Sequence, residues 1–330
     1  MRRFFAAVAL AAALLFVLAG AFAQSGGAVS RMRLAFANPP DDARIMMRWW
    51  WFGPSVEKAE LARELEMMKR GGIGGVEIQP VYPLALDDPK SGFKNEEYLS
   101  APFFDAVSFA NQKARALGLR VDITLGSGWP YGGPHIRPTE ASSRLRVEKV
   151  RVAADARSVA APVIGAGERL LASVPEMGLT PVNGRLALPV GMPATEVVFF
   201  IASRTGMQVK RPSVGAEGFV LDHLDRAALD RHLAVAGEPL LKAFGATPPT
   251  AVFSDSLEVY GADWSPDFLA EFQKRRGYDL VPHLTALIDS AAADAGSVRN
   301  DWGRTLTELV EERYLAPLSD WARQWKPPAR

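Results

Sequence analysis

Residues 45–80 read IMMRWWWFGPSVEKAELARELEMMKRGGIGGVEIQP, and this stretch holds the pattern that decides the fold. The apolar run 45–52 ends at a Gly-Pro pair and predicts a buried strand. Residues 56–70 carry apolar side chains at helical spacing, with Ser55 as the expected N-cap, and 75–79 predicts a second strand. A strand, a helix and another strand at this spacing are typical of a βαβ unit with parallel strands.

The alternation of strand and helix continues for one more unit and then stops. A helix is predicted at 102–117 and a third strand at 119–125, which is followed by a loop rich in glycine, tryptophan and proline. Residues 144–212 show no good helical pattern and contain alternating or β-rich stretches. An unstructured loop of this length would be unusual, so we expect a β-rich insertion after the third strand.

Strand and helix alternate again after the insertion. A fourth strand is predicted at 218–222, its helix at 225–244 and a fifth strand at 250–255. Two further helices are expected, at 266–276 and at about 298–325. The fold class is therefore α/β, and five strand–helix units predict a partial (β/α)8 TIM-like barrel, since a closed barrel needs eight. An open α/β sheet is the alternative.

These patterns also divide the chain. We expect the following segments: a signal peptide at 1–23, barrel units one to three at 24–140, the β-rich insertion at 141–215, and barrel units four and five with trailing helices at 216–330.

The N-terminal residues read as an export signal. Arg2 and Arg3 precede the uncharged apolar run 4–18, and Ala21 and Ala23 supply a small-x-small cleavage pattern. The run is shorter than the roughly 20 residues that cross a bilayer, which disfavours a membrane anchor. We therefore expect cleavage after Ala23, export to the periplasm or the medium, and no membrane association afterwards.

Composition excludes several classes of protein. The chain has no cysteine, so disulfides, thiol nucleophiles and thiolate metal sites are ruled out. Its net charge of +1 disfavours nucleic acid and anionic membranes as partners. Eight tryptophans are a high count, and their indole rings suit either stacking on sugars or packing in a core.

Polar and aromatic residues cluster where the predicted strands end. Chemistry in parallel barrels takes place at these carboxyl ends and in the loops that follow them. The candidates are Trp50, Trp51, Glu77, Trp129, His135, Asp222, His223, Asp255 and Glu258.

Two carboxylates among these candidates, Asp255 and Glu258, follow an apolar strand and precede an aromatic loop. Apolar and aromatic neighbours raise the pKa of a carboxyl group, which suits a general acid near neutral pH. The alternative is that Asp255 caps a turn and Glu258 is solvated. A lone histidine at a strand end, such as His223 or His135, is more often a structural residue than a catalytic one.

Several segments together resemble glycoside hydrolase family 106, the α-L-rhamnosidases. They are Arg48-Trp49-Trp50-Trp51-Phe52, the stretch from Leu61 to Glu77, Gly126-Ser127-Gly128-Trp129 with Gly132-Gly133-Pro134, Asp255-Ser256-Leu257-Glu258, Trp264-Ser265-Pro266, and the stretch from Phe272 to Asp279.

The resemblance implies a (β/α)8 barrel, removal of terminal α-L-rhamnosyl residues from a rhamnose-containing glycan or glycoside with inversion, and dependence on Ca²⁺. By motif, Glu258 is one of the two catalytic carboxylates, and we assign it the acid role. We expect the remaining candidates to contact substrate. Leu257 stands where the family commonly has tryptophan. The family's chains run longer, which places the second carboxylate beyond residue 330 and implies a truncated fragment.

Other functions fit the same residues. The chain could be a secreted sugar-binding protein without turnover, using Trp49 to Trp51, Trp129 and Trp264 as a platform. It could also be a barrel glycosidase for another sugar. Inversion requires two carboxyl groups roughly 6.5–9.5 Å apart, and Glu77, Asp222 and Asp225 are the possible partners of Glu258 within the chain.

Overall fold

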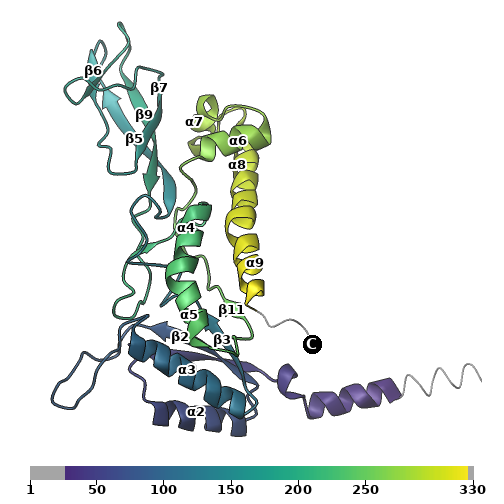
Figure 1. Cartoon of the computed structure of the whole chain (residues 1–330). Helices are drawn as coiled ribbons and strands as arrows, with labels where there is room; N and C mark the ends of the chain where they lie inside the picture. Colours follow the sequence, from purple (N-terminus) through teal and green to yellow (C-terminus); the bar gives the residue numbers. More distant parts are fainter. Residues whose placement is uncertain (1–26, 326–330) are drawn as a thin grey trace, which may run out of the picture.

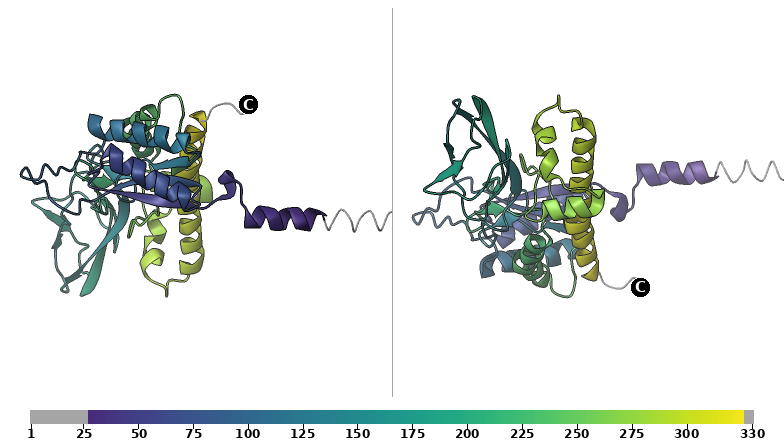
Figure 2. Two further views of the ribbon diagram at one scale, coloured as in Figure 1. Left: turned by 90° about the horizontal axis from the view of Figure 1, so that it is seen from below. Right: turned by 90° about the horizontal axis from the view of Figure 1, so that it is seen from above.

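The computed structural model describes residues 27–325. The predicted signal peptide, 1–23, lies outside these residues. A helical segment at 27–37 extends away from the rest of the described chain in both views of Figure 2. No helix in 27–325 combines the length and apolar character needed to cross a membrane.

A parallel four-stranded sheet forms the base of the molecule (Figure 1). Its strands follow the order β1 (Met46–Phe52), β2 (Gly75–Val81), β3 (Arg120–Thr124) and β11 (Val252–Phe253), and each is parallel to its neighbours. Helix α2 (Lys58–Arg70) joins β1 to β2, and α3 (Ala101–Ala116) joins β2 to β3. The βαβ units predicted from the sequence are therefore present.

The starts of these helices differ in how they are capped. Ser100 accepts a hydrogen bond from the backbone N–H of Phe103 and so caps α3. Ser55 was predicted to cap α2, but the N-cap position is Glu57, whose side chain makes no capping bond. The prediction fails because Val56 lies in a turn with Pro54 and Glu57 is still extended, so the first helical residue is Lys58.

The two faces of the sheet have opposite character. The face covered by helices buries Trp49, Trp51, Ile78 and Ile123 in the main hydrophobic cluster, together with apolar residues of α2 and α3. Alternate residues point the other way, because side chains alternate along a strand. On that second face Arg48 lies beside Glu77, and Glu77 lies beside Asp122, in one row across three strands.

The segment predicted to be a β-rich insertion contains two small antiparallel sheets. One has the order β5 (Ser143–Val152), β9 (Thr195–Arg204), β7 (Arg169–Val174), and the other pairs β6 (Ser158–Ala160) with β8 (Arg185–Ala187). In Figure 1 this unit projects away from the parallel sheet.

The predicted fourth strand does not join the parallel sheet. Residues Phe219–Val220 form the two-residue strand β10, which pairs antiparallel with β4 (Gly132–Gly133) in the loop after β3. Strand β11 takes the place beside β3 instead. The described residues therefore supply four parallel strands rather than five, and they do not close a barrel.

Helical segments occupy the rest of the chain. The predicted helix at 225–244 is continuous through α4 (Arg226–His232), a π-helical turn (Leu233–Gly237) and α5 (Glu238–Ala243). After β11 come α6 (Phe268–Arg276), α7 (Leu284–Ile288) and a long helix made of α8 (Ala295–Val310), a π-helical turn (Glu311–Leu315) and α9 (Ala316–Gln324). Short 3₁₀ turns lie at Asp41–Ala43 and Val281–His283.

Candidate active site

Arg48 organises the polar face of the sheet. One guanidinium nitrogen lies 2.9 Å from the Asp255 carboxylate and another lies 3.2 Å from that of Glu77. The cation also lies over the rings of Phe253, at 4.5 Å, and Trp50, at 5.4 Å. Residues from β1, β2 and the segment after β11 thus meet around one cation.

The environment of Glu77 has two opposing effects on the pKa of its carboxyl group. Burial raises the pKa of its carboxyl group above the ordinary value, and the nearby Arg48 guanidinium counteracts that rise. The carboxylates of Asp255 and Asp122 add to the rise. Glu77 is consequently a carboxyl group whose charge state depends on Arg48.

Trp50 and Trp129 form the aromatic part of this site. The Trp50 side chain is 39% exposed, and its ring centroid lies 6.2 Å from that of Trp129. Two indoles at this separation, one of them open to solvent, offer an apolar surface of the kind on which a sugar ring stacks. Both had been predicted to contact substrate.

Glu258 lies beside Trp129, in contact with Lys210. The Lys210 ammonium is 2.7 Å from the carboxylate, and the Ser256 hydroxyl donates a hydrogen bond to it at 2.9 Å. These hydrogen bonds, the Lys210 bond most strongly, lower the pKa of Glu258, and Trp129 contributes in the same direction. The sequence predicted a raised pKa, and that prediction is wrong because Lys210, 48 residues earlier, supplies a cation.

The loop after β3 fixes where Lys210 lies. The backbone N–H of Trp129 donates to the carbonyl of Lys210 at 3.0 Å, and the N–H of Lys210 donates back at 2.8 Å. Gly128 has a φ of +69°, and a Cβ there would lie 2.0 Å from the Lys210 carbonyl oxygen. Only glycine allows this close approach, so Gly128 holds Lys210 and Trp129 together.

Two tryptophans expected at the site belong to the core instead. Trp51 is 1% exposed and its ring packs edge-on against Trp49 and Phe103, on the helix-covered face of the sheet. Trp264 is also 1% exposed and packs on Phe268. Alternation along β1 explains the first case, because Trp50 and Trp51 must point to opposite faces.

Asp222 and His223 are both buried. Asp222 is buried, accepts hydrogen bonds from the Ser143 hydroxyl and the Leu224 backbone, and lies 3.7 Å from Arg204 at the base of the insertion. Burial raises its pKa to about 7. His223 is buried against the ring of Tyr314. Both side chains are therefore buried in the described residues, and the buried Nε2 of His223 has no hydrogen-bond partner there, so their assignment to substrate binding stays a prediction.

His135 belongs to a histidine pair. Its Nε2 lies 3.0 Å from Nδ1 of His232, whose Nε2 lies 3.0 Å from the Leu125 carbonyl oxygen. Burial lowers the pKa of His135 to about 4 and that of His232 to about 3. His135 thus contacts a buried neighbour through one ring nitrogen, and its role in substrate binding stays a prediction. The His232 pairing had no signal in the sequence.

Asp225, considered as a partner for Glu258, caps helix α4 by accepting a hydrogen bond from the Ala227 backbone. The hydrogen bonds of Asp222 and Asp225 go to other groups, and the Glu258 carboxylate is hydrogen-bonded by Lys210 and Ser256. Glu77 and Asp255, on either side of Arg48, lie on the polar face of the sheet together with Asp122.

The same carboxylates are the candidate ligands for a metal ion. Across 27–325, no group of three or more histidine, aspartate or glutamate side chains is placed to hold a metal ion. Glu77 and Asp255 already pair with the Arg48 cation, which would compete with a bound metal. The described residues do not fit a Ca²⁺ site, and we assign no catalytic step to the ion.

A hollow of about 630 Å³ lies beside β1 and shares Trp50 with the candidate site. It is lined by Trp49 to Phe52, by the start of α2, including Glu60 and Glu64, and by residues 92–94 and Glu96. Glu64 there accepts a hydrogen bond from the Trp49 indole at 2.6 Å. The hollow contains neither Arg48 nor Glu258 among its lining residues.

Parallel α/β folds place their ligand sites at the carboxyl ends of the strands, and the polar and aromatic residues described above belong to such a sheet and to the loops that follow its strands. The sequence profile of glycoside hydrolase family 106, described as alpha-L-rhamnosidase, matches residues 37–160 and 182–327. The chain therefore belongs to glycoside hydrolase family 106, which confirms the resemblance noted in its sequence.

Two relatives are considerably longer than this chain. It is 24% identical to a protein of Formosa agariphila named "Putative beta-glucuronidase", and the match covers 88% of this chain and 30% of that protein. The solved rhamnosidase of Novosphingobium sp. PP1Y shares the fold, with a TM-score of 0.63 at 18% identity, over 88% of this chain and 46% of the other. The chain thus spans less than half the length of either relative.

Proposed function

We propose that this chain carries part of the active site of an exported glycoside hydrolase that removes terminal α-L-rhamnosyl residues. The observation that supports it most is the Trp50–Trp129 pair beside Glu258, on the same face as the Glu77–Arg48–Asp255 cluster. Membership of family 106 supports rhamnose as the sugar. The four parallel strands, with helices on one face, are consistent with part of a (β/α)8 barrel.

In this proposal each group has a defined task. The sugar stacks on the Trp50–Trp129 pair, and Glu77 and Asp255, held in place by Arg48, accept hydrogen bonds from sugar hydroxyls. Glu258 donates its proton to the glycosidic oxygen as the bond to the leaving group breaks. An inverting reaction also needs a carboxylate that activates water on the opposite side of the ring.

The experiment is hydrolysis of a rhamnosyl disaccharide by the full-length protein, followed as free rhamnose. Loss of general acid assistance predicts that Glu258→Gln lowers kcat by roughly 10²–10⁴, and by less on aryl rhamnosides, whose leaving groups need little protonation. Glu60→Gln, in the hollow beside β1, is the matched control and should retain activity. Wild-type rates for Glu258→Gln on the disaccharide would contradict the proposal.

A second candidate is sugar binding without turnover, favoured by the lowered pKa of Glu258 in the free protein. Rhamnoside binding to the Trp50–Trp129 pair, with no release of rhamnose by the full-length protein, is the result that would select it.

A further inference from the structure

The segment that follows β9 carries two consecutive cations, Lys210 and Arg211, past the ends of β2 and β3. Lys210 is paired through its backbone with Trp129, as described above. The carbonyl of Arg211 accepts a hydrogen bond from the Tyr82 backbone at 3.1 Å, directly after β2. Both residues therefore have fixed backbone positions beside the candidate active site.

The two side chains differ in their partners. The Lys210 ammonium contacts Glu258 and lies 4.3 Å from the ring centroid of Tyr260. Arg211 is exposed, lies 4.9 Å from the ring centroid of Tyr82, and pairs with no carboxylate of residues 27–325. Its φ of +55° is unusual for a residue with a side chain, and such strain tends to occur at functional sites.

We propose that Lys210 and Arg211 form an anion subsite, which selects glycans carrying a carboxylate on the sugar next to the rhamnose that is released. This inference rests on the proposed function and specifies its substrate class. Lys210 already binds a carboxylate, that of Glu258, with the short contact typical of a charge-assisted hydrogen bond. The exposed Arg211 supplies a second, uncompensated positive charge nearby.

The subsite also accounts for a conflict within the site. Glu258 must hold a proton to act as an acid, yet its bond to Lys210 favours the ionised form. A substrate carboxylate that took over the Lys210 ammonium would weaken this effect and leave Glu258 easier to protonate. A neutral substrate would leave the Lys210–Glu258 pair intact.

The rival explanation is that Lys210 only orients Glu258. Under that explanation the charge of the substrate is irrelevant to affinity, whereas the subsite requires a preference for the acid. Binding affinity separates the two because it does not depend on turnover.

The test measures binding of two sulfur-linked, non-hydrolysable disaccharides by calorimetry: rhamnosyl-glucuronic acid and its methyl ester. We expect the wild-type protein to bind the acid about tenfold more tightly than the ester, as a charge-assisted hydrogen bond predicts. Lys210→Met should bring the ratio close to one, Lys210→Arg should preserve it, and Arg211→Gln should lower it partly. Lys149→Met removes a matched Lys–Glu pair on the insertion and should leave the ratio unchanged.

Each outcome bears on one claim. Equal binding of acid and ester by the wild type, or an unchanged preference in a folded Lys210→Met protein, overturns the anion subsite while rhamnoside recognition stands. Binding of neither disaccharide overturns the proposed function and the subsite with it.

Discussion

Arg48 shows how much of the site depends on one side chain. Its guanidinium separates Glu77 from Asp255, two carboxylates that would otherwise repel each other across adjacent parts of the sheet. The same cation lies against Trp50 and Phe253, so it fixes aromatic as well as acidic groups. The sequence motif contained this arginine, but its partners lie 29 and 207 residues away along the chain.

We therefore predict that Arg48→Met lowers the free energy of unfolding by about 1–3 kcal/mol at pH 7, because partly buried carboxylates lose their counter-ion. The loss should be smaller at pH 5, where the raised pKa of Glu77 allows it to take up a proton and lose its charge. Urea denaturation at both pH values measures this. Arg48→Met/Glu77→Gln should recover part of the stability, and no recovery would contradict the assignment.

At the scale of elements, the glycine before Trp129 provides a sharp test. Gly128→Ala places a methyl group against the Lys210 carbonyl. We therefore expect the free energy of unfolding to fall by more than about 2 kcal/mol and Lys210 to be displaced. Gly206→Ala is the matched control, since Gly206 has a φ of +70° but no atom within 4 Å of an added Cβ. It should cost only about 1–2 kcal/mol, from the left-handed backbone alone. Equal losses in urea denaturation would contradict the close-approach argument.

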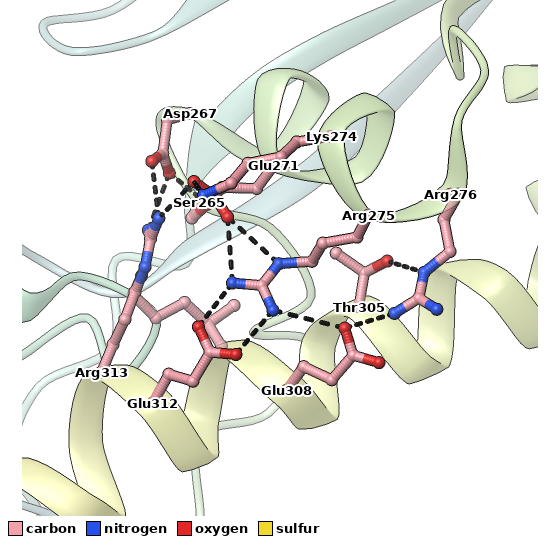
Figure 3. A network of polar contacts seen from close by, with 11 residues as sticks. Ser265, Asp267, Glu271, Lys274, Arg275, Arg276, Thr305, Glu308, Glu312 and Arg313 are labelled. Carbon is pink, nitrogen blue, oxygen red and sulfur yellow. Dashed lines mark hydrogen bonds and ion pairs between the residues drawn. The ribbon is translucent and has the colours of Figure 1, made fainter.

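Helices α6 and α8 are joined by an ionic network, which Figure 3 shows. Arg275 contacts Glu271, Glu308 and Glu312, and neighbouring Arg276 bonds to Glu308 and to the Thr305 hydroxyl. The network secures the helices that follow β11, and with them the segment that carries Asp255 and Glu258.

We expect Arg275→Met to lower the free energy of unfolding by about 1–3 kcal/mol, since it leaves three carboxylates close together without their shared cation. Lys274→Met removes an adjacent, well exposed charge and should change it by less than about 0.5 kcal/mol. Thermal unfolding of both variants in low salt checks the difference, and similar midpoints would show that the network contributes little.

Local patterns predicted most elements well, because strand and helix periodicities depend on near neighbours. The strands at 45–52, 75–79 and 119–125 and the insertion's lack of helices could be read in this way. The pairing of 219–220 with Gly132–Gly133 could not, because a strand pattern does not state its partner. Likewise, the contact between Lys210 and Glu258 could not be predicted, because it depends on where the chain returns from the insertion to the sheet.

For the whole molecule, buried histidines predict a loss of stability in acid. Burial lowers the pKa of His223 and His232 to about 3 and that of His135 to about 4, against about 6.5 in the unfolded chain. The unfolded state therefore takes up protons that the folded state excludes, and stability is lost as the pH falls below 6.5. At pH 5 each histidine lowers the free energy of unfolding by about 2 kcal/mol relative to neutral pH.

Asp222 acts in the opposite direction. Its pKa of about 7 means that the folded state keeps a proton that the unfolded state releases, so stability decreases as the pH rises from about 4 to 7. One carboxyl offsets about one of the three histidines, and we expect a net loss of about 2–4 kcal/mol between pH 7 and pH 5. Urea denaturation of His223→Leu should reduce that loss by about 2 kcal/mol, and an unchanged pH dependence would contradict the assignment.

The central claim is that a rhamnosyl group binds on the Trp50–Trp129 pair beside Glu258, and a crystal structure of the protein with a non-hydrolysable rhamnoside tests it most directly. The account predicts that the sugar ring contacts both indoles, with the glycosidic atom within hydrogen-bonding distance of Glu258. A rhamnoside bound instead in the hollow beside Glu60 and Glu64, or away from Glu258, would contradict it.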